Sequence, residues 1–414
     1  MRIVIASDVY WPAMNGCSVA SKSVADGMSF LKHEVIVLAP SQTKKSGVEK
    51  DGAVKIYRLK SNNFPFYHNQ ITPPPIPNKI YKDGFKICVT PYKEIADILD
   101  EFKPDVIHVK TPLMIGQAAN KYAVKNHIPC VATNHFLPEN LIDNLRAFAL
   151  VSKPISETIK LYEKDFLKKF DYVTMPTQMA IDLFWKVKER KIGLPPIEPV
   201  SNGIDLGKFK VGKVPGGFYK KYHIPKDKPI VTHLGRLDNE KHVGVLVEAF
   251  AKIAKRTGAF LVLVGCGNDE DNLKELVREL GISDKVIFTG KIIDKDKEII
   301  HRVGTVFCMP SPVELQSLSM LEAMACGQPV VAVNAGALGE LCQNGVNGYL
   351  CEKDDVAGIA KALREILLDK NLRNKFSLGS LAIAKKHDVQ LSWKHYEAIY
   401  QKVIDLKKGM TGGI

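Results

Sequence analysis

The sequence predicts an α/β protein with two Rossmann-like domains, each built around a parallel sheet. Short β-branched runs alternate along the chain with longer amphipathic stretches, which is the pattern of parallel strands covered by helices. This alternation restarts near the middle of the chain, after a segment rich in proline and glycine. The chain has 414 residues, of which 45% are hydrophobic, so it is long enough to bury two cores.

Short apolar runs predict the strands of both domains. They lie at residues 2–7, 34–40, 55–59, 106–110, 130–134 and 172–176 in the first half, and at 229–235, 260–265, 286–290, 305–310 and 329–333 in the second. Between the first two strands of the second half, HVGVLVEAFAKIAKR has the apolar spacing of an amphipathic helix.

The boundary between the domains is predicted in KIGLPPIEPVSNGIDLGKF, where three prolines and three glycines interrupt both periodicities. The predicted domains therefore span residues 1–195 and 196–387. Apolar residues at helical spacing follow, so residues 388–414 are expected to form a final helix that packs across the domain junction. These apolar residues are Trp393, Tyr396, Tyr400 and Val403.

The formal net charge of +13 predicts an anionic partner. Composition alone leaves this partner open between a nucleotide phosphate, a nucleic acid and an acidic membrane surface. Residues 1–195 contain 27 Lys and Arg against 19 Asp and Glu, so the excess is larger in the first half. The sequence has neither a zinc-finger spacing nor an aromatic-basic RNA-binding motif, so no nucleic-acid partner is expected.

Cysteine usage and hydropathy indicate a cytoplasmic protein. The eight cysteines include no C-x-x-C pair, which is typical of a chain kept in the reducing cytosol. The N-terminus lacks the pattern of a signal peptide, and nowhere do eighteen apolar residues follow one another. No segment is therefore expected to span a membrane.

Basic residues at a strand end suggest a phosphate site. In open α/β sheets, ligands bind outside the carboxyl ends of the strands. Arg236 and Lys241 follow the strand at 229–235 and are close enough in sequence to reach one diphosphate; the alternative is a solvated basic pair. CGNDED after the next strand lacks the third glycine of a dinucleotide fingerprint, and no P-loop motif occurs. No cofactor is expected.

Two glutamates flank the turn in PSPVELQSLSMLEAMACG. Glu314 lies in the loop after the strand at 305–310, where a structural role is not obvious. Glu322 lies three residues after Ser319, which is the spacing of a capping box, so Glu322 could simply bind backbone amides at the start of a helix.

Taken together, these motifs resemble those of the family 4 retaining glycosyltransferases of the GT-B fold. The resemblance rests on the spacing of Glu314 and Glu322, on GRLDNEK, on SNGID and on MNGCS, and it covers essentially the whole chain. It implies two Rossmann-like domains that face each other across a cleft, the first binding the acceptor and the second the nucleotide sugar. TNHFLPENL and PSPVELQSLSMLEAMA resemble the bacterial diacylglycerol glycosyltransferases, which are glycolipid synthases.

The resemblance implies four catalytic residues. Arg236 and Lys241 would bind the donor diphosphate and offset the charge that grows on the leaving nucleotide. Glu314 would accept hydrogen bonds from the sugar hydroxyls. His135, at the carboxyl end of the strand at 130–134, would lie beside the transferred sugar, although a single histidine is more often structural.

The resemblance also implies further donor contacts. Glu322 would bind the ribose hydroxyls, and backbone amides near Leu318 and Ser319 would face the phosphates. The segment around Lys291 would border the base, and the Gly16 amide would approach from the other domain. The implied donor-binding set is Gly16, Arg236, Lys241, Lys291, Ile292, Glu314, Leu318, Ser319 and Glu322.

Three segments bear on how far the family pattern applies. Many members have two glycines where this chain has Asn15-Gly16, and glycines where it has Leu315-Gln316-Ser317, so the side chains beside the phosphates differ. The segment from Asp294 to Asp296 has the spacing of a metal motif in the other major transferase fold. It directly precedes a helical pattern, so an exposed helix start and no metal are expected.

The resemblance implies a metal-independent hexosyltransferase. The expected reaction moves glucose from UDP-glucose to a membrane lipid such as diacylglycerol and forms an α-glycosidic bond. A soluble saccharide or polyol is the alternative acceptor, and a sugar-nucleotide-binding protein without transfer activity is the alternative class.

An amphipathic stretch in the first half suggests contact with the anionic inner face of the cell membrane. Apolar residues recur at helical spacing over residues 155–170 with lysines between them, which is the pattern of a helix lying on an anionic bilayer. The alternative is an ordinary helix packed on its sheet. The residues expected at the membrane are Ile155, Ile159, Lys164, Phe166, Lys168 and Lys169.

Overall fold

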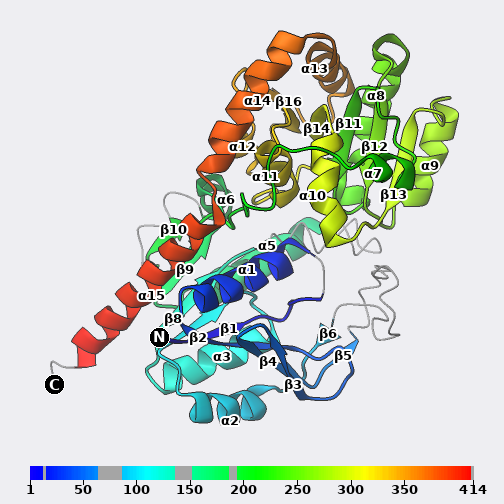
Figure 1. Cartoon of the computed structure of the whole chain (residues 1–414). Coiled ribbons are helices and arrows are strands. Elements are labelled where there is room, and N and C mark those ends of the chain that lie inside the picture. Colours follow the sequence, from blue (N-terminus) through cyan, green and yellow to red (C-terminus); the bar gives the residue numbers. More distant parts are fainter. Residues whose placement is uncertain (13–14, 64–85, 136–151, 186–193, 412–414) are drawn as a thin grey trace. The chain divides into compact units, whose positions relative to one another are not determined.

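The structure of the protein is a computed structural model. It describes the chain except for residues 13–14, 64–85, 136–151, 186–193 and 412–414 (Figure 1). The chain divides into two compact units. Unit 1 contains the described part of residues 1–202 together with the final segment from Val389, and unit 2 contains Gly203–Asp388.

Within the described residues, unit 1 has an eight-stranded sheet in the order β10-β9-β8-β7-β1-β2-β4-β3. Neighbouring strands are parallel, except that β3 and β4 are antiparallel. The strands are β1 (Arg2–Ala6), β2 (Glu34–Pro40), β3 (Gly47–Asp51), β4 (Val54–Leu59), β7 (Val106–Val109), β8 (Cys130–Thr133), β9 (Tyr172–Met175) and β10 (Ile197–Pro199). A separate short pair joins β5 (Asn62–Asn63) and β6 (Lys86–Ile87).

Helices cover the sheet of unit 1. They are α1 (Gly16–Phe30), α2 (Tyr92–Phe102), α3 (Met114–Lys125), α5 (Ser152–Leu167), α6 (Gln178–Phe184) and α15 (Val389–Thr411). α1 packs beside α15, and α2 packs beside α3 on the opposite face of the sheet (Figure 1). The predicted final helix is α15, and its Tyr396, Tyr400 and Val403 are buried in the core of unit 1.

Unit 2 has a parallel sheet, which in its described residues contains six strands in the order β13-β12-β11-β14-β15-β16. The strands are β11 (Ile230–Leu234), β12 (Phe260–Val264), β13 (Val286–Gly290), β14 (Val306–Met309), β15 (Val330–Val333) and β16 (Gly348–Cys351). The helices are α7 (Gly216–Lys221), the 3₁₀ helix η3 (Asn239–Lys241), α8 (Val243–Thr257), α9 (Glu270–Glu279), α10 (Asp294–Val303), α11 (Leu318–Ala325), α12 (Leu338–Leu341), α13 (Val356–Leu368) and α14 (Lys370–Lys385).

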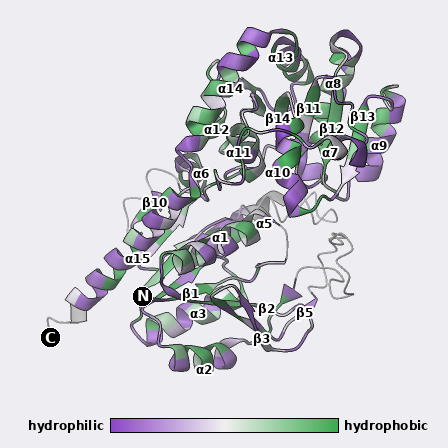
Figure 2. Ribbon diagram, viewed as in Figure 1, coloured by the Kyte–Doolittle hydropathy of each residue, from purple (hydrophilic) through white to green (hydrophobic). Residues whose placement is uncertain are grey.

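The cores follow the hydropathy of the strands. Figure 2 shows hydrophobic residues along β11, β12 and β14, while the helices around them carry hydrophilic residues on their outer sides. α8 and α13 pack against each other over this sheet. Residues such as Val231, Leu261 and Phe307 have no exposed surface, which is expected of parallel strands covered on both faces.

All the runs predicted as strands form strands, and the α/β fold with two Rossmann-like sheets is confirmed. Three strands of the two sheets were missed: β3, β10 and β16. β10 lies inside the proline-rich segment predicted to be the domain boundary, and it contains Pro199. It is the edge strand beside β9, a position where a proline is tolerated because one side of the strand has no partner.

The strand order of each sheet reverses at one point. In unit 1 the chain runs outward from β1 through β2 in one direction and from β7 through β8 in the other, so the reversal lies between β1 and β7. In unit 2 it lies between β11 and β14. Ligands of open α/β sheets bind outside the carboxyl ends of the strands at such reversals. The fold therefore marks one candidate site in each unit.

Candidate active site

The carboxyl ends of β11 and β14 carry the residues predicted to hold the donor. β11 is followed by Gly235, Arg236 and then η3, which ends at Lys241. β14 is followed by the turn that contains Glu314 and then by α11. Because β11 and β14 are neighbours at the strand reversal of unit 2, Lys241 meets Glu314 although 73 positions separate them in the sequence.

Lys241 and Glu314 form an ion pair. The Nζ atom of Lys241 lies 2.8 Å from Oε1 of Glu314 and 3.8 Å from Oε1 of Glu240. The side chains of Lys241 and Glu314 are 14% and 16% exposed, so both are packed in the site yet partly accessible to a ligand. The structure thus joins the cation predicted for the diphosphate and the carboxylate predicted for the sugar in one contact.

Arg236 is fixed by two carboxylates. Its guanidinium forms ion pairs with Asp238 and Glu240, which are 5% and 3% exposed. Asp238 also accepts a hydrogen bond from the backbone N–H of Asn268 at 2.8 Å. The alternative of a solvated basic pair therefore fails for Arg236 and for Lys241, because acids that are largely removed from water hold both.

The start of α11 lies beside Glu314. The Ser317 hydroxyl caps this helix by accepting a hydrogen bond from the Met320 N–H at 3.3 Å. Leu318 and Ser319 occupy the first turn, where backbone N–H groups without helical partners suit an anion. The capping-box alternative for Ser319 and Glu322 is wrong, because Ser317 is the cap and Glu322 contacts α10 instead.

Glu322 is a buried carboxylate held by two residues of α10. Its Oε2 lies 3.1 Å from Nε2 of His301, its Oε1 pairs with Lys297, and the residue is 3% exposed. Burial raises the pKa of Glu322, but Lys297 and the hydrogen bond with His301 outweigh burial, so the pKa is lowered. The carboxylate is therefore ionised and fixed in place.

The segment predicted to border the base follows β13. β13 is the edge strand, two strands away from β11. Ile292 is 9% exposed and belongs to an apolar cluster with Phe218 and Ile300. Lys291 is partly buried, and burial lowers its pKa. In the described part of unit 2, neither residue forms a hydrogen bond or an ion pair with Lys241 or Glu314.

The two aspartates with metal-motif spacing lie in the first turn of α10. Asp294 is exposed, as expected for a helix start. Asp296 is buried instead, because it accepts a hydrogen bond from the Tyr222 hydroxyl at 2.5 Å and pairs with Lys221. In the described ranges, no group of three or more His, Cys, Asp and Glu side chains is arranged to hold a metal ion.

In unit 1, Gly16, which was predicted in a loop, begins α1, and His135 follows a strand as predicted. Gly16 is the first residue of α1, whose cap is Asn15; the Asn15 Oδ1 accepts a hydrogen bond from Ser18 N–H at 2.9 Å. A Cβ added at Gly16 would meet no atom within 4 Å, so packing alone does not require glycine there. His135 follows β8, and burial together with the charge of Lys110 lowers its pKa well below the usual range. The rest of TNHFLPENL lies outside the described residues.

Two charged residues at the strand reversal of unit 1 were missed. Asp8, just after β1, is 2% exposed and accepts hydrogen bonds from Ile115 N–H at 2.8 Å and the Thr111 hydroxyl at 2.7 Å. Lys110, just after β7, is 1% exposed, and its ammonium lies 5.2 Å from the centre of the Tyr396 ring. A charged residue directly after an apolar strand is the sequence signal that could have identified both.

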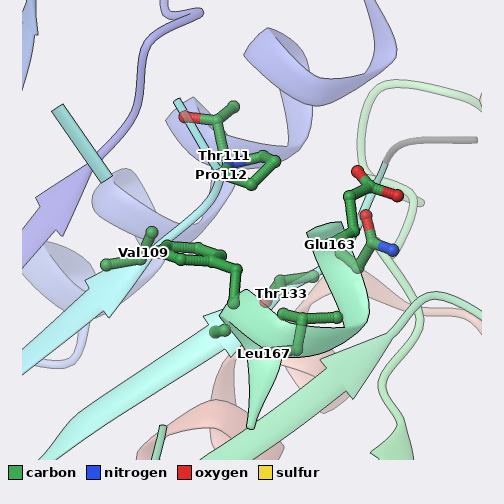
Figure 3. A pocket seen from close by; sticks show the side chains of 9 residues that line it. Val109, Thr111, Pro112, Thr133, Glu163 and Leu167 are labelled. Carbon is green, nitrogen blue, oxygen red and sulfur yellow. The ribbon is translucent and has the colours of Figure 1, made fainter. Parts of the chain in front are cut away.

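Figure 3 shows a small cavity at the carboxyl ends of β7 and β8. Val109, Thr111 and Pro112 line it from one side, and Glu163 and Leu167 of α5 line it from another. Its volume of about 10 Å³ is enough for a single water molecule. The cavity is therefore too small to hold a sugar or a lipid headgroup in this conformation.

The stretch predicted to lie on a membrane forms α5, and part of it is buried. Phe166 and Lys164 are 5% and 9% exposed, and the Lys164 ammonium lies 5.4 Å from the Trp185 ring. These two residues therefore do not belong to a free membrane-facing surface. Lys168 and Lys169 are exposed. Ile159 is partly buried, and the side chain of Ile155 lies outside the described residues.

Two family models match the chain in consecutive segments. The model described as Glycosyltransferase Family 4 matches residues 14–208, and the model described as Glycosyl transferases group 1 matches residues 218–379. This chain is a family 4 glycosyltransferase.

The glycosyltransferase is similar to relatives whose names state different products. It is 25% identical over 372 residues to alpha-monoglucosyldiacylglycerol synthase of Streptococcus pneumoniae, a match that covers 88% of this chain and 78% of the relative. It is 34% identical over 192 residues to N-acetyl-alpha-D-glucosaminyl L-malate synthase of Bacillus anthracis, covering 46% of this chain and 50% of the relative.

The glycosyltransferase has the GT-B fold. Anabaena HepE in complex with UDP superimposes with a TM-score of 0.70 at 18% identity, over 97% of this chain and 100% of that one. Across the described residues of the enzyme, no helix is both long and apolar enough to cross a membrane.

The burial of Lys110 should make the free energy of unfolding depend on pH. Burial lowers the pKa of Lys110 from 10.5 to about 7, so between these pH values the unfolded chain binds a proton that the folded enzyme does not. The penalty for burying this amine is therefore complete below pH 7 and disappears as the pH rises towards 10.5. Lys110→Met should be more stable than the wild type to urea at pH 6, and the difference should shrink steadily up to pH 9.

The control is Lys44→Met, which replaces an exposed lysine of the same unit. Its effect on the free energy of unfolding should not depend on pH in this range. A stability difference between Lys110→Met and the wild type that stayed constant from pH 6 to 9 would show that Lys110 is charged in the folded enzyme throughout.

Proposed function

We propose that this glycosyltransferase transfers glucose from UDP-glucose to a membrane lipid such as diacylglycerol, with retention at the anomeric carbon. The observation that carries the proposal is the contact between Lys241 and Glu314, which puts a cation suited to a diphosphate beside a carboxylate suited to sugar hydroxyls. The likeness to alpha-monoglucosyldiacylglycerol synthase supports the sugar and the acceptor. The likeness to HepE in its UDP complex supports the nucleotide.

In the proposed reaction, Arg236 and Lys241 bind the diphosphate of the donor. Negative charge grows on the leaving nucleotide as the glycosidic bond breaks, and cations fixed in advance stabilise that charge without reorganising. These basic side chains would supply the charge that a divalent metal supplies in other transferases. The amides of Leu318 and Ser319 at the start of α11 would add hydrogen bonds to the phosphates.

The two glutamates would bind the hydroxyls at the two ends of the donor. Glu314 accepts hydrogen bonds from the transferred sugar once Lys241 turns to the diphosphate. Glu322 accepts hydrogen bonds from the ribose; each of its oxygens has one contact with α10 and keeps a second lone pair for a hydroxyl. The roles of Gly16, Lys291 and Ile292 remain predictions.

Retention follows if both bond changes take place on one face of the sugar. The bond from the anomeric carbon to the phosphate oxygen breaks through an oxocarbenium-like transition state, and the acceptor hydroxyl attacks the same face. The leaving phosphate takes the proton of that hydroxyl, so no nucleophile from the enzyme is required. His135 would lie beside the transferred sugar with a neutral ring, since its pKa is lowered well below the usual range.

The central test is the identity of the product. The enzyme is incubated with a panel of nucleotide sugars and with vesicles that contain diacylglycerol, and the products are identified by mass spectrometry. The expected product is an α-glucosyl lipid formed from UDP-glucose. Transfer to a soluble saccharide, a polyol or malate in place of the lipid would contradict the proposed acceptor, and nucleotide-sugar binding without any product would contradict enzyme activity.

Removing either donor cation should slow transfer. Arg236→Ala and Lys241→Ala each delete a charge-assisted hydrogen bond, which contributes about 1.5–3 kcal/mol, so each variant should lose at least about tenfold in kcat/KM for the donor. Initial rates of UDP release measure this. Lys226→Ala, which removes an exposed lysine of the same unit, should retain wild-type kinetics.

The same rates should be unchanged in EDTA, because the basic residues replace a metal in the proposal. Activity that disappears in EDTA and returns with Mn²⁺ or Mg²⁺ would contradict metal independence. Near wild-type kinetics in both Arg236→Ala and Lys241→Ala would contradict the proposed donor site.

An anionic membrane surface should bind unit 1 through the exposed side of α5 and the two lysines that follow this helix. Leu161 is 66% exposed, and Lys168 and Lys169, just after the end of α5, are exposed as well. Each lysine near an anionic bilayer contributes about 1 kcal/mol, so changing both to Ser should weaken binding at least about tenfold. Cosedimentation with phosphatidylglycerol vesicles measures this, and binding should fall as salt rises.

The matched control changes Lys44 and Lys45 to Ser, which removes the same charge from another exposed part of unit 1. This variant should pellet nearly as well as the wild type. Equal losses in the two double variants would show that net charge alone attracts the enzyme, and a wild type that ignores the vesicles at low salt would remove the membrane from the proposal.

A further inference from the structure

His233 is a buried histidine at the strand reversal of unit 2 that the proposed reaction does not use. It lies near the end of β11, has no exposed surface, and stacks with Phe307 of β14 at 6.3 Å between ring centres. Lys241 and Glu314 are close enough to influence its charge. A polar ring is thus buried beside the ion pair that defines the donor site.

The hydrogen bond of Nδ1 of His233 determines the tautomer of the ring. Nδ1 of His233 lies 3.0 Å from the carbonyl oxygen of Cys308. A carbonyl oxygen only accepts, so Nδ1 carries the hydrogen and Nε2 of the neutral ring presents a lone pair. Burial, only partly opposed by this hydrogen bond and by Glu314, lowers the pKa of His233 to about 4, so the ring is neutral at physiological pH.

Nε2 of His233 points toward the turn that carries Arg236. A Cβ built on Gly235 would lie 3.3 Å from this nitrogen, so Nε2 is directed to the carboxyl end of β11. It is buried, and among the described residues it has no hydrogen-bond partner. Leaving a buried acceptor unpaired is costly, which favours a state of the enzyme in which a donor reaches it.

Lys241 is the charged neighbour that can supply this donor. A carboxylate such as Glu314 has no hydrogen to give, and Arg236 already directs N–H groups at Asp238 and Glu240. The ammonium of Lys241 has three N–H bonds, of which one is directed at Glu314. When a sugar hydroxyl takes the place of Lys241 at Glu314, the ammonium turns to the diphosphate and still has an N–H bond for a second acceptor.

We infer that His233 is a positioning residue whose Nε2 accepts a hydrogen bond from Lys241 when the donor separates Lys241 from Glu314. This inference rests on the proposed role of Lys241 in binding the diphosphate. A neutral acceptor has an advantage over a carboxylate at this place. It holds the ammonium in one direction yet leaves its positive charge uncancelled, and the full charge then acts on the leaving diphosphate.

Two conservative substitutions separate the roles of the two nitrogens. The side-chain amide of His233→Asn falls near Nδ1 and can still donate to Cys308, but nothing replaces Nε2. The longer side chain of His233→Gln brings an amide oxygen near Nε2 and gives up the Nδ1 contact. His233→Phe keeps a ring against Phe307 and removes both nitrogens. Thermal melting identifies which variants are folded.

The readouts are the Kd of UDP, measured by calorimetry, and the donor KM and kcat. We expect His233→Asn and His233→Phe to weaken UDP binding about tenfold, the loss of one charge-assisted hydrogen bond, and His233→Gln to stay within about threefold of the wild type. If His233 serves only to join β11 to β14, the order reverses, and His233→Asn binds UDP better than His233→Gln. The inference would be overturned by that reversed order. It would also be overturned if His233→Asn and His233→Gln lost UDP affinity equally, or if both bound UDP as the wild type does. If His233→Phe does not fold, the Asn and Gln pair still decides.

A double-mutant cycle tests whether His233 acts through Lys241. In a Lys241→Met background, His233→Asn should cause less than about a twofold further loss of UDP affinity, because the partner of Nε2 is absent. A full additional loss would overturn the inference. The single variant Lys241→Met separates the two proposals. If Lys241→Met binds UDP as tightly as the wild type does, the proposed donor site itself is contradicted. If Lys241→Met loses UDP affinity while every His233 variant keeps it, only the role of His233 is contradicted.

Discussion

The ion pair between Lys241 and Glu314 is the contact on which the site of unit 2 depends. Lys241 follows β11 and Glu314 follows β14, so the pair joins the ends of the two strands at which the sheet reverses. Neither side chain is fully hydrated, and each reduces the cost of burying the charge of the other. In the proposed reaction the diphosphate therefore does not meet a free cation. It displaces Glu314 from Lys241, and the sugar hydroxyls then form hydrogen bonds with Glu314.

The residues of this site could be predicted from sequence, whereas their contacts could not. Apolar β-branched runs mark where β11 and β14 end, and Arg236 and Glu314 stand out as charged residues in the loops that follow these strands. The pairing of Lys241 with Glu314 depends on β11 and β14 being neighbours, and strand order is set by packing over the whole unit. His233 was missed because it lies inside an apolar run, where one polar residue does not alter the pattern.

At two places one local sequence pattern fits two environments, so the sequence alone could not choose between them. Ser319 and Glu322 have the spacing of a capping box, but α11 begins at Leu318 behind Ser317, and Glu322 is bound by His301 of α10. The apolar stripe of α5 looks the same whether it faces a bilayer or a sheet. Phe166 is buried, so at that point the stripe serves the core of unit 1. Periodicity identifies the face of a helix, and only tertiary packing identifies what covers it.

The reversal point of unit 1 depends on the last helix of the chain. The ring of His108 in β7 bonds the Tyr400 hydroxyl of α15 at 2.5 Å through Nδ1 and the Thr133 hydroxyl at 2.6 Å through Nε2, and 292 positions separate His108 from Tyr400. Tyr396 of the same helix lies against the ammonium of Lys110. These polar groups are buried beside apolar strands, where unpaired polar atoms are costly. Without α15, His108 would lose its hydrogen bond with Tyr400, and Lys110 would lose its aromatic neighbour Tyr396. Because α15 follows unit 2 in the sequence, these contacts of unit 1 can form only after the whole of unit 2 has been synthesised.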